Sequence, residues 1–342
     1  MQHILIADLP ASSPGFVELL AREGLPASAA LCRAARQAEQ EPLRDDAQAA
    51  WLTPAERWLA RALHLQRDDV EQAPWARLAA MADGLGDAFD ASQPLGALTP
   101  AHLLLGRDSL SLTDPADLAL PEDEARALFD AASGLFADAG WTLRYAAPLR
   151  WYVAHPSLAE VVTAGVARAR GRSVAAWMPA GPAARPWRQL LTEVQMTWQH
   201  HPINEARLAR GERDINALWL HGCGSLPAGW NSPMRLAEPG GAAPARDALV
   251  DAVLHGMADA ARPDAADALH WIDAGALLAG DPVIGLRTID AALSAALQTA
   301  LAAESRVRLT VAGDRLWRTL EVGRGGWAPW RRTRLTELFA AV

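Results

Sequence analysis

The sequence contains no lysine, and all 32 of its basic side chains are arginine. Without a lysine amine, the chain cannot form a Schiff base with a carbonyl substrate, and it cannot place a P-loop lysine on a nucleotide phosphate. Enzyme classes that depend on either contact are therefore excluded. The abundance of Ala, Arg, Gly and Pro favours codon bias in a GC-rich genome as the origin of this composition.

Cysteine and long apolar runs are also scarce. The two cysteines, Cys32 and Cys223, cannot build a disulfide framework, and neither belongs to a pair spaced for zinc. No stretch of about 18 apolar residues occurs, as a membrane span would need. Residues 1–8 lack the basic start and the long apolar stretch of a signal peptide. We therefore expect a cytoplasmic protein with no membrane partner.

The charge is mildly acidic, with 40 acidic side chains against 32 basic ones and a net charge of -8. No cluster of basic residues offsets this balance, so we expect no nucleic-acid partner. The 342 residues are 51% hydrophobic, which supplies enough apolar surface for a large core. These values predict a globular protein.

Apolar periodicity switches repeatedly between strand and helix patterns. Thr53-Pro54-Ala55-Glu56 has the form of a capping box that opens a helix. A short helix is expected to carry Asn204, Arg207 and Gly211. The glycines of Gly222-Cys223-Gly224 predict a turn. The other expected helices cover 121–138, 156–169, 187–198, 247–261 and 282–303. The expected strands cover 3–8, 101–112 with an internal turn, 141–153, 216–220, 268–273 and 306–312.

This alternation predicts an α/β fold with a mostly parallel sheet flanked by helices. The runs at 3–8, 216–220, 268–273 and 306–312 are apolar without interruption, as expected for strands buried on both faces. We therefore expect these four strands to belong to one sheet.

The most distinctive segment is His200-His201-Pro202-Ile203-Asn204-Glu205-Ala206-Arg207, followed by Asn216 before an apolar strand. Asn204 and Arg207 are three residues apart, so a helix places both on one face, where an amide and a guanidinium could grip a phosphate or carboxylate. The alternative is architectural, with Asn204 capping a turn and Arg207 paired with a neighbouring acid. The sequence leaves both readings open.

The remaining candidates near this segment have similar alternatives. Gly222 and Gly224 could let backbone N–H groups approach an anion, or simply allow a tight turn. His221 follows a buried strand and is either a site residue or a structural histidine. His200 and His201 are adjacent, so one helix face cannot offer both to a metal, and we expect one to cap or pack while the other is exposed.

The segment resembles the "His-Pro-x-Asn, three residues to Arg, then Gly, then Asn before an apolar strand and Gly-x-Gly" pattern of archaeal-type cofactor-independent phosphoglycerate mutases. Over most of its length the chain also looks like the RpfE-type bacterial regulatory proteins, distant relatives of those mutases. The resemblance implies an alkaline-phosphatase-like core formed by 1–45 and 212–322. It further implies an α+β region at 46–211, inserted or N-terminal, and a C-terminal tail helix at 323–342.

Mutases of this superfamily hold two metal ions with Asp and His side chains and use a Ser or Thr nucleophile, so two cations stabilise the phosphoryl group. Here Asp8 follows the first strand without the family's glycines, and His270 and Asp273 stand where another ligand cluster is expected. No histidine follows His270, and the family's late Asp-His pair is reduced to Asp314. We expect Asp8, His270 and Asp273 to be remnants and no two-metal centre to form.

The expected function is that of a pseudoenzyme: a phosphoglycerate-mutase-like regulatory protein that binds a small phosphate ligand or a protein partner, with no catalytic residue and no cofactor. The candidate ligand-binding residues are Asn204, Arg207, Asn216, His221, Gly222 and Gly224. The alternative is an active phosphomutase or phosphatase that uses two divalent cations such as manganese on a small phosphate ester. A third reading is an interaction module presenting Trp/Arg surfaces such as Trp327, Trp330, Arg331, Arg332 and Arg334, unless these residues only pack the C-terminal tail through cation–π contacts.

Overall fold

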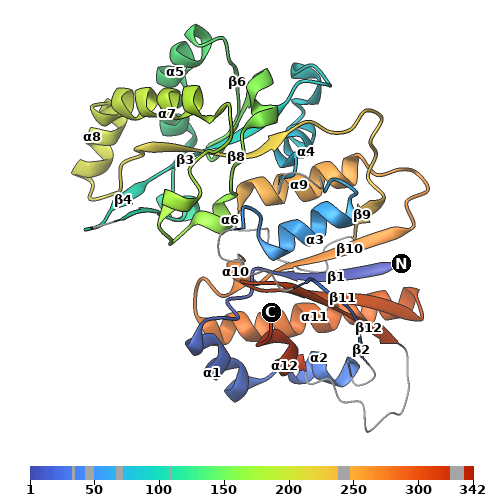
Figure 1. Ribbon diagram of the computed structural model, residues 1–342. Helices are drawn as coiled ribbons and strands as arrows, with labels where there is room; N and C mark the ends of the chain where they lie inside the picture. Colours follow the sequence, from blue (N-terminus) through green and yellow to red (C-terminus); the bar gives the residue numbers. More distant parts are fainter. Residues whose placement is uncertain (33–34, 43–49, 67–71, 108, 238–246, 324–334) are drawn as a thin grey trace. The chain divides into compact units, whose positions relative to one another are not determined.

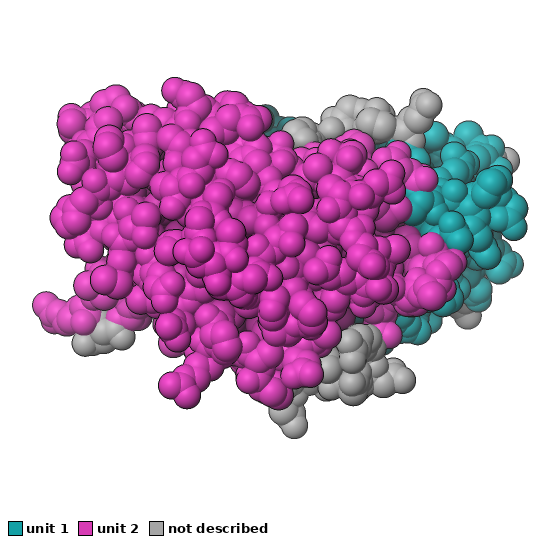
Figure 2. All heavy atoms as spheres, turned by 90° about the horizontal axis from the view of Figure 1, so that it is seen from above, with its two compact units in different colours: residues 1–64, 231–246, 260–342 teal, residues 65–230, 247–259 magenta. Residues whose placement is uncertain are grey.

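The computed structural model describes all residues except 33–34, 43–49, 67–71, 108, 238–246 and 324–334. The Trp/Arg patch expected at 327–334 lies outside the described residues. The chain divides into two compact units: unit 1 comprises 1–64, 231–246 and 260–342, and unit 2 comprises 65–230 and 247–259 (Figure 2). Within the described part of the chain, no helix is long and apolar enough to cross a membrane.

Unit 1 is built on a six-stranded sheet in the order β2-β12-β11-β1-β10-β9 (Figure 1). Its strands are β1 (Gln2–Ala7), β2 (Arg36–Gln40), β9 (Met234–Leu236), β10 (Asp267–Asp273), β11 (Arg306–Ala312) and β12 (Trp317–Gly323). Its helices are α1 (Pro14–Glu23), α2 (Pro26–Leu31), α3 (Pro54–Ala62), α10 (Ala274–Leu277), α11 (Pro282–Ala303) and α12 (Leu335–Phe339).

The centre of this sheet is parallel. Strand β1 runs parallel to both β10 and β11, and β9 runs parallel to β10, whereas β12 and β2 are antiparallel additions at one edge. Every residue of β1 is buried. Ile4 and Ile6 join a core with α1, α11 and α12, while His3 on the other face lies against Trp58 of α3. The predicted mixed α/β architecture with a mostly parallel central sheet is therefore present.

Unit 2 contains an antiparallel sheet in the order β6-β7-β3-β8 and a separate hairpin, β4-β5. Its strands are β3 (Leu95–Ala101), β4 (Leu103–Leu105), β5 (Leu110–Leu112), β6 (Thr142–Ala147), β7 (Arg150–Ala154) and β8 (Ala217–Gly224). Its α-helices are α4 (Trp75–Ala82), α5 (Glu122–Asp138), α6 (Val166–Ala169), α7 (Ala184–Gln199), α8 (Pro202–Ala209) and α9 (Ala248–Asp259). Its 3₁₀ turns are η1 (Gly86–Ala88), η2 (Pro115–Leu118), η3 (Pro156–Glu160) and η4 (Val174–Ala176).

The core of unit 2 lies between its sheet and helices α5 and α7. It is rich in tryptophan: Trp151, Trp187 and Trp198 are completely buried, and Trp151 and Trp198 meet edge to face. Edge-to-face contacts of this kind add stabilisation beyond the burial of the rings. Helix α4 packs against β3, β8 and α9, and Gly256 of α9 lies against the backbone of Leu78.

The expectation that 216–220 shares a sheet with 3–8 is wrong. Strand β8 pairs antiparallel with β3, whereas β1 belongs to the sheet of unit 1. An antiparallel strand covered by helices on both faces has the same unbroken apolar pattern as a central parallel strand, so the pattern did not distinguish them. Residues 212–230 accordingly lie with unit 2.

Two further local expectations need correction. The predicted helix over 156–169 is the short turn η3 followed by extended backbone and the single-turn helix α6. Gly222-Cys223-Gly224 is not a turn, because β8 continues through all three residues. The capping box of α3 is confirmed: the Thr53 hydroxyl accepts from the Glu56 N–H at 3.2 Å, and the Glu56 carboxylate accepts from the Thr53 N–H at 2.7 Å.

Candidate functional site

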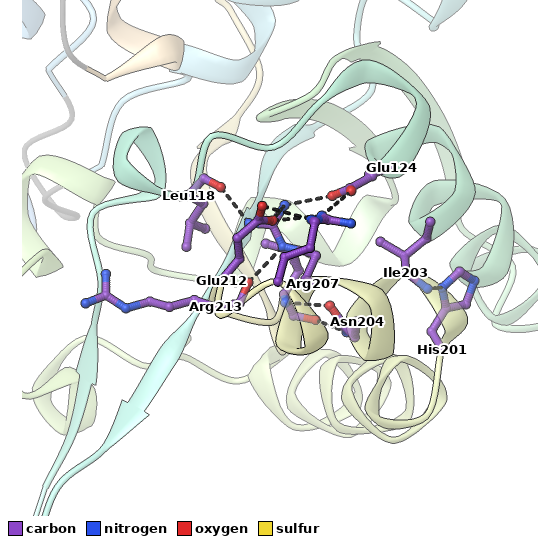
Figure 3. Close-up of polar contacts among 10 residues, drawn as sticks. Leu118, Glu124, His201, Ile203, Asn204, Arg207, Glu212 and Arg213 are labelled. Carbon is purple, nitrogen blue, oxygen red and sulfur yellow. Dashed lines mark hydrogen bonds and ion pairs between the residues drawn. The ribbon is translucent and has the colours of Figure 1, made fainter.

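Helix α8 carries Asn204 and Arg207, the centre of the distinctive sequence segment (Figure 3). His201 caps the helix, because its Nδ1 accepts from the Ile203 N–H at 3.3 Å, and Pro202 occupies the first turn, where no N–H is needed. His200 is exposed, which confirms the expected division of roles between the two histidines. Asn204 and Arg207 share the buried face of α8, each with 1% of its surface exposed.

The Asn204 side chain links α7 to the segment that leads into β8 through hydrogen bonds. Its Nδ2 donates to the carbonyls of Trp198 at 2.9 Å and Ile215 at 2.8 Å, and its Oδ1 accepts from the Ile215 N–H at 2.8 Å. Both ends of the amide are thus used by backbone groups. A buried amide needs such partners, because an unsatisfied polar group inside the protein costs free energy.

Arg207 is surrounded by acceptors (Figure 3). Its Nη1 lies 2.7 Å from the carboxylate of Glu124, its Nη2 donates to the Leu118 carbonyl at 2.6 Å, and its Nε donates to the Arg213 carbonyl at 2.8 Å. Glu124 also accepts from the partly exposed Arg210 at 2.6 Å. The fork that could hold a ligand anion is engaged by the protein's own carboxylate, which favours the architectural alternative for this residue.

Asn216 is likewise engaged by the protein's own polar groups. It precedes β8, and its Oδ1 accepts from the Leu103 N–H at 2.7 Å while its Nδ2 donates to the Leu103 carbonyl at 3.2 Å. The side chain therefore pairs with backbone as a neighbouring strand would, and it joins β4 to the start of β8. From Asn216 to His221 the strand advances roughly 17 Å at about 3.3 Å per residue. Asn216 and His221 are therefore not side by side.

At the far end of β8, Gly222 and Gly224 make room for the start of α4. A Cβ at Gly222 would lie 3.0 Å from the Ala76 amide nitrogen, and one at Gly224 would lie 3.3 Å from the Pro74 side chain. Their positive φ values, 64° and 139°, also favour glycine. His221 is 1% exposed, its Nε2 lies 2.9 Å from the Thr99 hydroxyl, and burial lowers its pKa. Close backbone packing thus accounts for both glycines.

Three acids stand at the carboxyl edge of the sheet in unit 1. Asp273 ends β10 in register with Ala7 of β1, and Asp8 follows β1 with a φ of 55°. Asp273 caps α10 by accepting from the Ala276 N–H at 2.7 Å. Asp314, beyond β11, accepts from both the N–H and the hydroxyl of Ser12, at 2.9 and 2.6 Å. These contacts tie loops together at the strand ends.

The remnant metal ligand candidates do not all lie on one face of the sheet. His270 and Asp273 are three residues apart on β10, so their side chains point to opposite faces of the sheet. His270 instead contacts Gln2, with Nε2 and Oε1 3.1 Å apart, and burial lowers its pKa. No group of three or more His, Cys, Asp or Glu residues within the described ranges is placed to hold a metal ion. His270 therefore does not share a sheet face with Asp273.

A pocket of about 210 Å³ lies beside Ser12, and no sequence pattern indicates it. Its lining includes Arg315 and Arg318, which come from the β11–β12 connection and the start of β12. Two arginines three residues apart are too common to single out in an arginine-rich sequence. Their significance appears only when the connection folds beside the loop after β1.

Comparisons with known proteins return similar solved structures at low sequence identity. No protein-family model matches the chain, and no curated protein matches it. A solved cofactor-independent phosphoglycerate mutase from Thermoplasma acidophilum is similar at 13% identity and a TM-score of 0.41, over 99% of this chain and 94% of that chain. The PH0037 protein from Pyrococcus horikoshii is similar at 13% identity and a TM-score of 0.48, over 95% and 88%. At these values the likeness assigns no activity.

Proposed function

We propose that this chain is a regulatory, RpfE-type protein on a phosphoglycerate-mutase-like scaffold, which binds a small ligand or a protein partner and does not carry out two-metal phosphoryl transfer. One observation carries the proposal: His270 and Asp273 lie on opposite faces of β10, while Asp273 and Asp314 serve as a helix cap and a loop anchor. Two-metal catalysis needs side chains that converge on cations about 3.5–4 Å apart. Donors on opposite faces of one strand do not converge in this way, which supports the proposal.

The alternative is an active metal-dependent phosphomutase or phosphatase, and one contact favours it. The Ser12 hydroxyl is 2.6 Å from the Asp314 carboxylate, at the same sheet edge as Asp8 and Asp273. A hydroxyl held by a carboxylate is an arrangement in which a nucleophile can be activated. The same hydrogen bond equally serves to fix the loop after β1.

The deciding experiment measures metal content and activity on the same purified chain. Metal analysis is performed after incubation with manganese and removal of the excess, and phosphoglycerate mutase and phosphate-ester hydrolysis are assayed with manganese present. The proposal expects fewer than one tightly bound ion per chain and no turnover above the blank. Two bound ions with turnover that disappears in both Ser12→Ala and Asp273→Asn would refute it and establish the alternative. Thr288→Ala, an exposed change on α11, is the matched control.

A further inference from the structure

The pocket in unit 1 has an unusual distribution of charge. It is formed by the loop after β1, the β11–β12 connection and the end of the described chain at 340–342. Ser12, Arg315 and Arg318 are its polar lining residues, and Leu316 and Ala11 supply apolar walls. Its two ionisable lining side chains are both guanidinium groups, which are always protonated.

Neither arginine is neutralised by a side chain in the described part of the chain. Arg315 is exposed and Arg318 is partly buried, and neither forms an ion pair or a side-chain hydrogen bond there. The Nε of Arg318 is buried without an acceptor. By contrast, Arg57, Arg150 and Arg207 each bind a carboxylate at close range. Both guanidinium groups therefore belong to pocket-lining residues and have no carboxylate side-chain partner among the described residues.

The nearest acid does not supply that anion. Asp314 precedes Arg315, and its carboxylate already accepts two hydrogen bonds from Ser12. Val342 approaches the pocket from the other side, where its carbonyl carbon would lie 2.6 Å from a Cβ at Gly313. Its chain end nevertheless forms no ion pair with either arginine. Within the described residues, therefore, no ion pair engages the guanidinium groups of Arg315 and Arg318.

We propose that this pocket binds a small oxyanion, with one carboxylate or phosphate group held between Arg315 and Arg318. Guanidinium groups match the oxygens of both anions with paired N–H donors. A volume of about 210 Å³ is below the roughly 300–1,000 Å³ of pockets for drug-sized ligands, so the ligand is a small acid or phosphate ester. This inference rests on the ligand-binding function proposed above and places its ligand in a pocket of unit 1.

The test measures binding of two probes, inorganic phosphate and malonate, to the full chain by isothermal titration calorimetry at low ionic strength. We expect saturable binding of at least one probe and a weakening of at least tenfold in Arg315→Ala and in Arg318→Gln. Arg287→Ala is the matched control, because this arginine is 71% exposed and pairs with Glu23 in the same unit. Its binding should equal that of the unmodified chain.

Preference for phosphate identifies a phosphate ester as the ligand class, and preference for malonate identifies a carboxylic acid. Absence of saturable binding of either probe, or equal binding in Arg315→Ala, overturns the inference. Because Arg315 is exposed, its variant should fold even if Arg318→Gln does not, and circular dichroism checks both. Turnover with manganese in the mutase assay would refute the proposed function without changing these titrations, so the two failures are distinguishable.

Discussion

Replacing Arg207 by alanine should strongly destabilise unit 2. The side chain is 1% exposed, and its loss leaves Glu124 without its 2.7 Å partner and the carbonyls of Leu118 and Arg213 without their donors. Breaking a buried ion pair by removing one partner costs about 3–5 kcal/mol. Glu124 keeps Arg210 as a second cation, which offsets part of the loss, while the two orphaned carbonyls add about 1–3 kcal/mol each. We expect a net loss of at least about 3 kcal/mol.

Urea unfolding followed by tryptophan fluorescence measures this loss, because the core of unit 2 contains Trp151, Trp187 and Trp198. Arg210→Ala is the control: that side chain is 45% exposed, so the unfolding midpoint should move much less. Melting with and without 3-phosphoglycerate completes the assay. A loss below about 1 kcal/mol, together with a phosphoglycerate-induced stabilisation that disappears in Arg207→Ala, would refute the architectural role and restore ligand binding at α8.

Three more outcomes follow from burial. Gly256→Ala should destabilise unit 2 by at least about 2 kcal/mol, because the new Cβ would lie 1.9 Å from a carbonyl oxygen of α4. Gly134→Ala, in open space on α5, should instead stabilise the protein by about 0.5–1 kcal/mol. The urea unfolding midpoints of the two variants compare these effects, and similar midpoints would contradict the packing of α9 on α4. Burial raises the pKa of the Cys32 and Cys223 thiols to about 12. Iodoacetamide at pH 8 should therefore label neither cysteine until urea unfolds the protein. Rapid labelling of the folded protein would show an accessible thiol instead. Burial lowers the pKa of His221 below 6.5, so the unfolded chain binds the proton more readily than the folded chain. The free energy of unfolding should therefore fall as the pH drops below about 6.5. His221→Gln should flatten this pH dependence, and an unchanged slope would exclude His221 as its source.

Local elements could be predicted well where a capping signal accompanied an apolar stripe. Helix α11 was expected over 282–303 and occupies Pro282–Ala303, because Asp281 caps its first turn and proline starts it. Helix α5 and strands β1, β10 and β11 could also be predicted from the sequence. The signals in these cases lie within a few residues of the element itself, so one sequence contains them.

Strand partners and side-chain partners could not be predicted in the same way. Nothing near 216–220 indicates that β8 pairs with β3, more than 100 residues earlier, and the apolar pattern fits either sheet. The partner of Arg207 is Glu124, 83 residues away, so the choice between ligand and architecture depends on tertiary contacts. The arginine pocket has the same origin, since Ser12 and Asp314 are 302 residues apart.

The position of β1 in its sheet sets an order for folding during synthesis. Its neighbours β10 and β11 leave the ribosome long afterwards: Gln2 and His270, whose side chains meet, are 268 residues apart. At about 5–20 residues per second, that interval lasts roughly 13–54 s. Throughout it, Ile4, Leu5 and Ile6 have neither of their strand partners, a condition that favours aggregation of a nascent chain. The sheet of unit 2 is complete once Gly224 has emerged, so it can form while β1 is still without its strand partners.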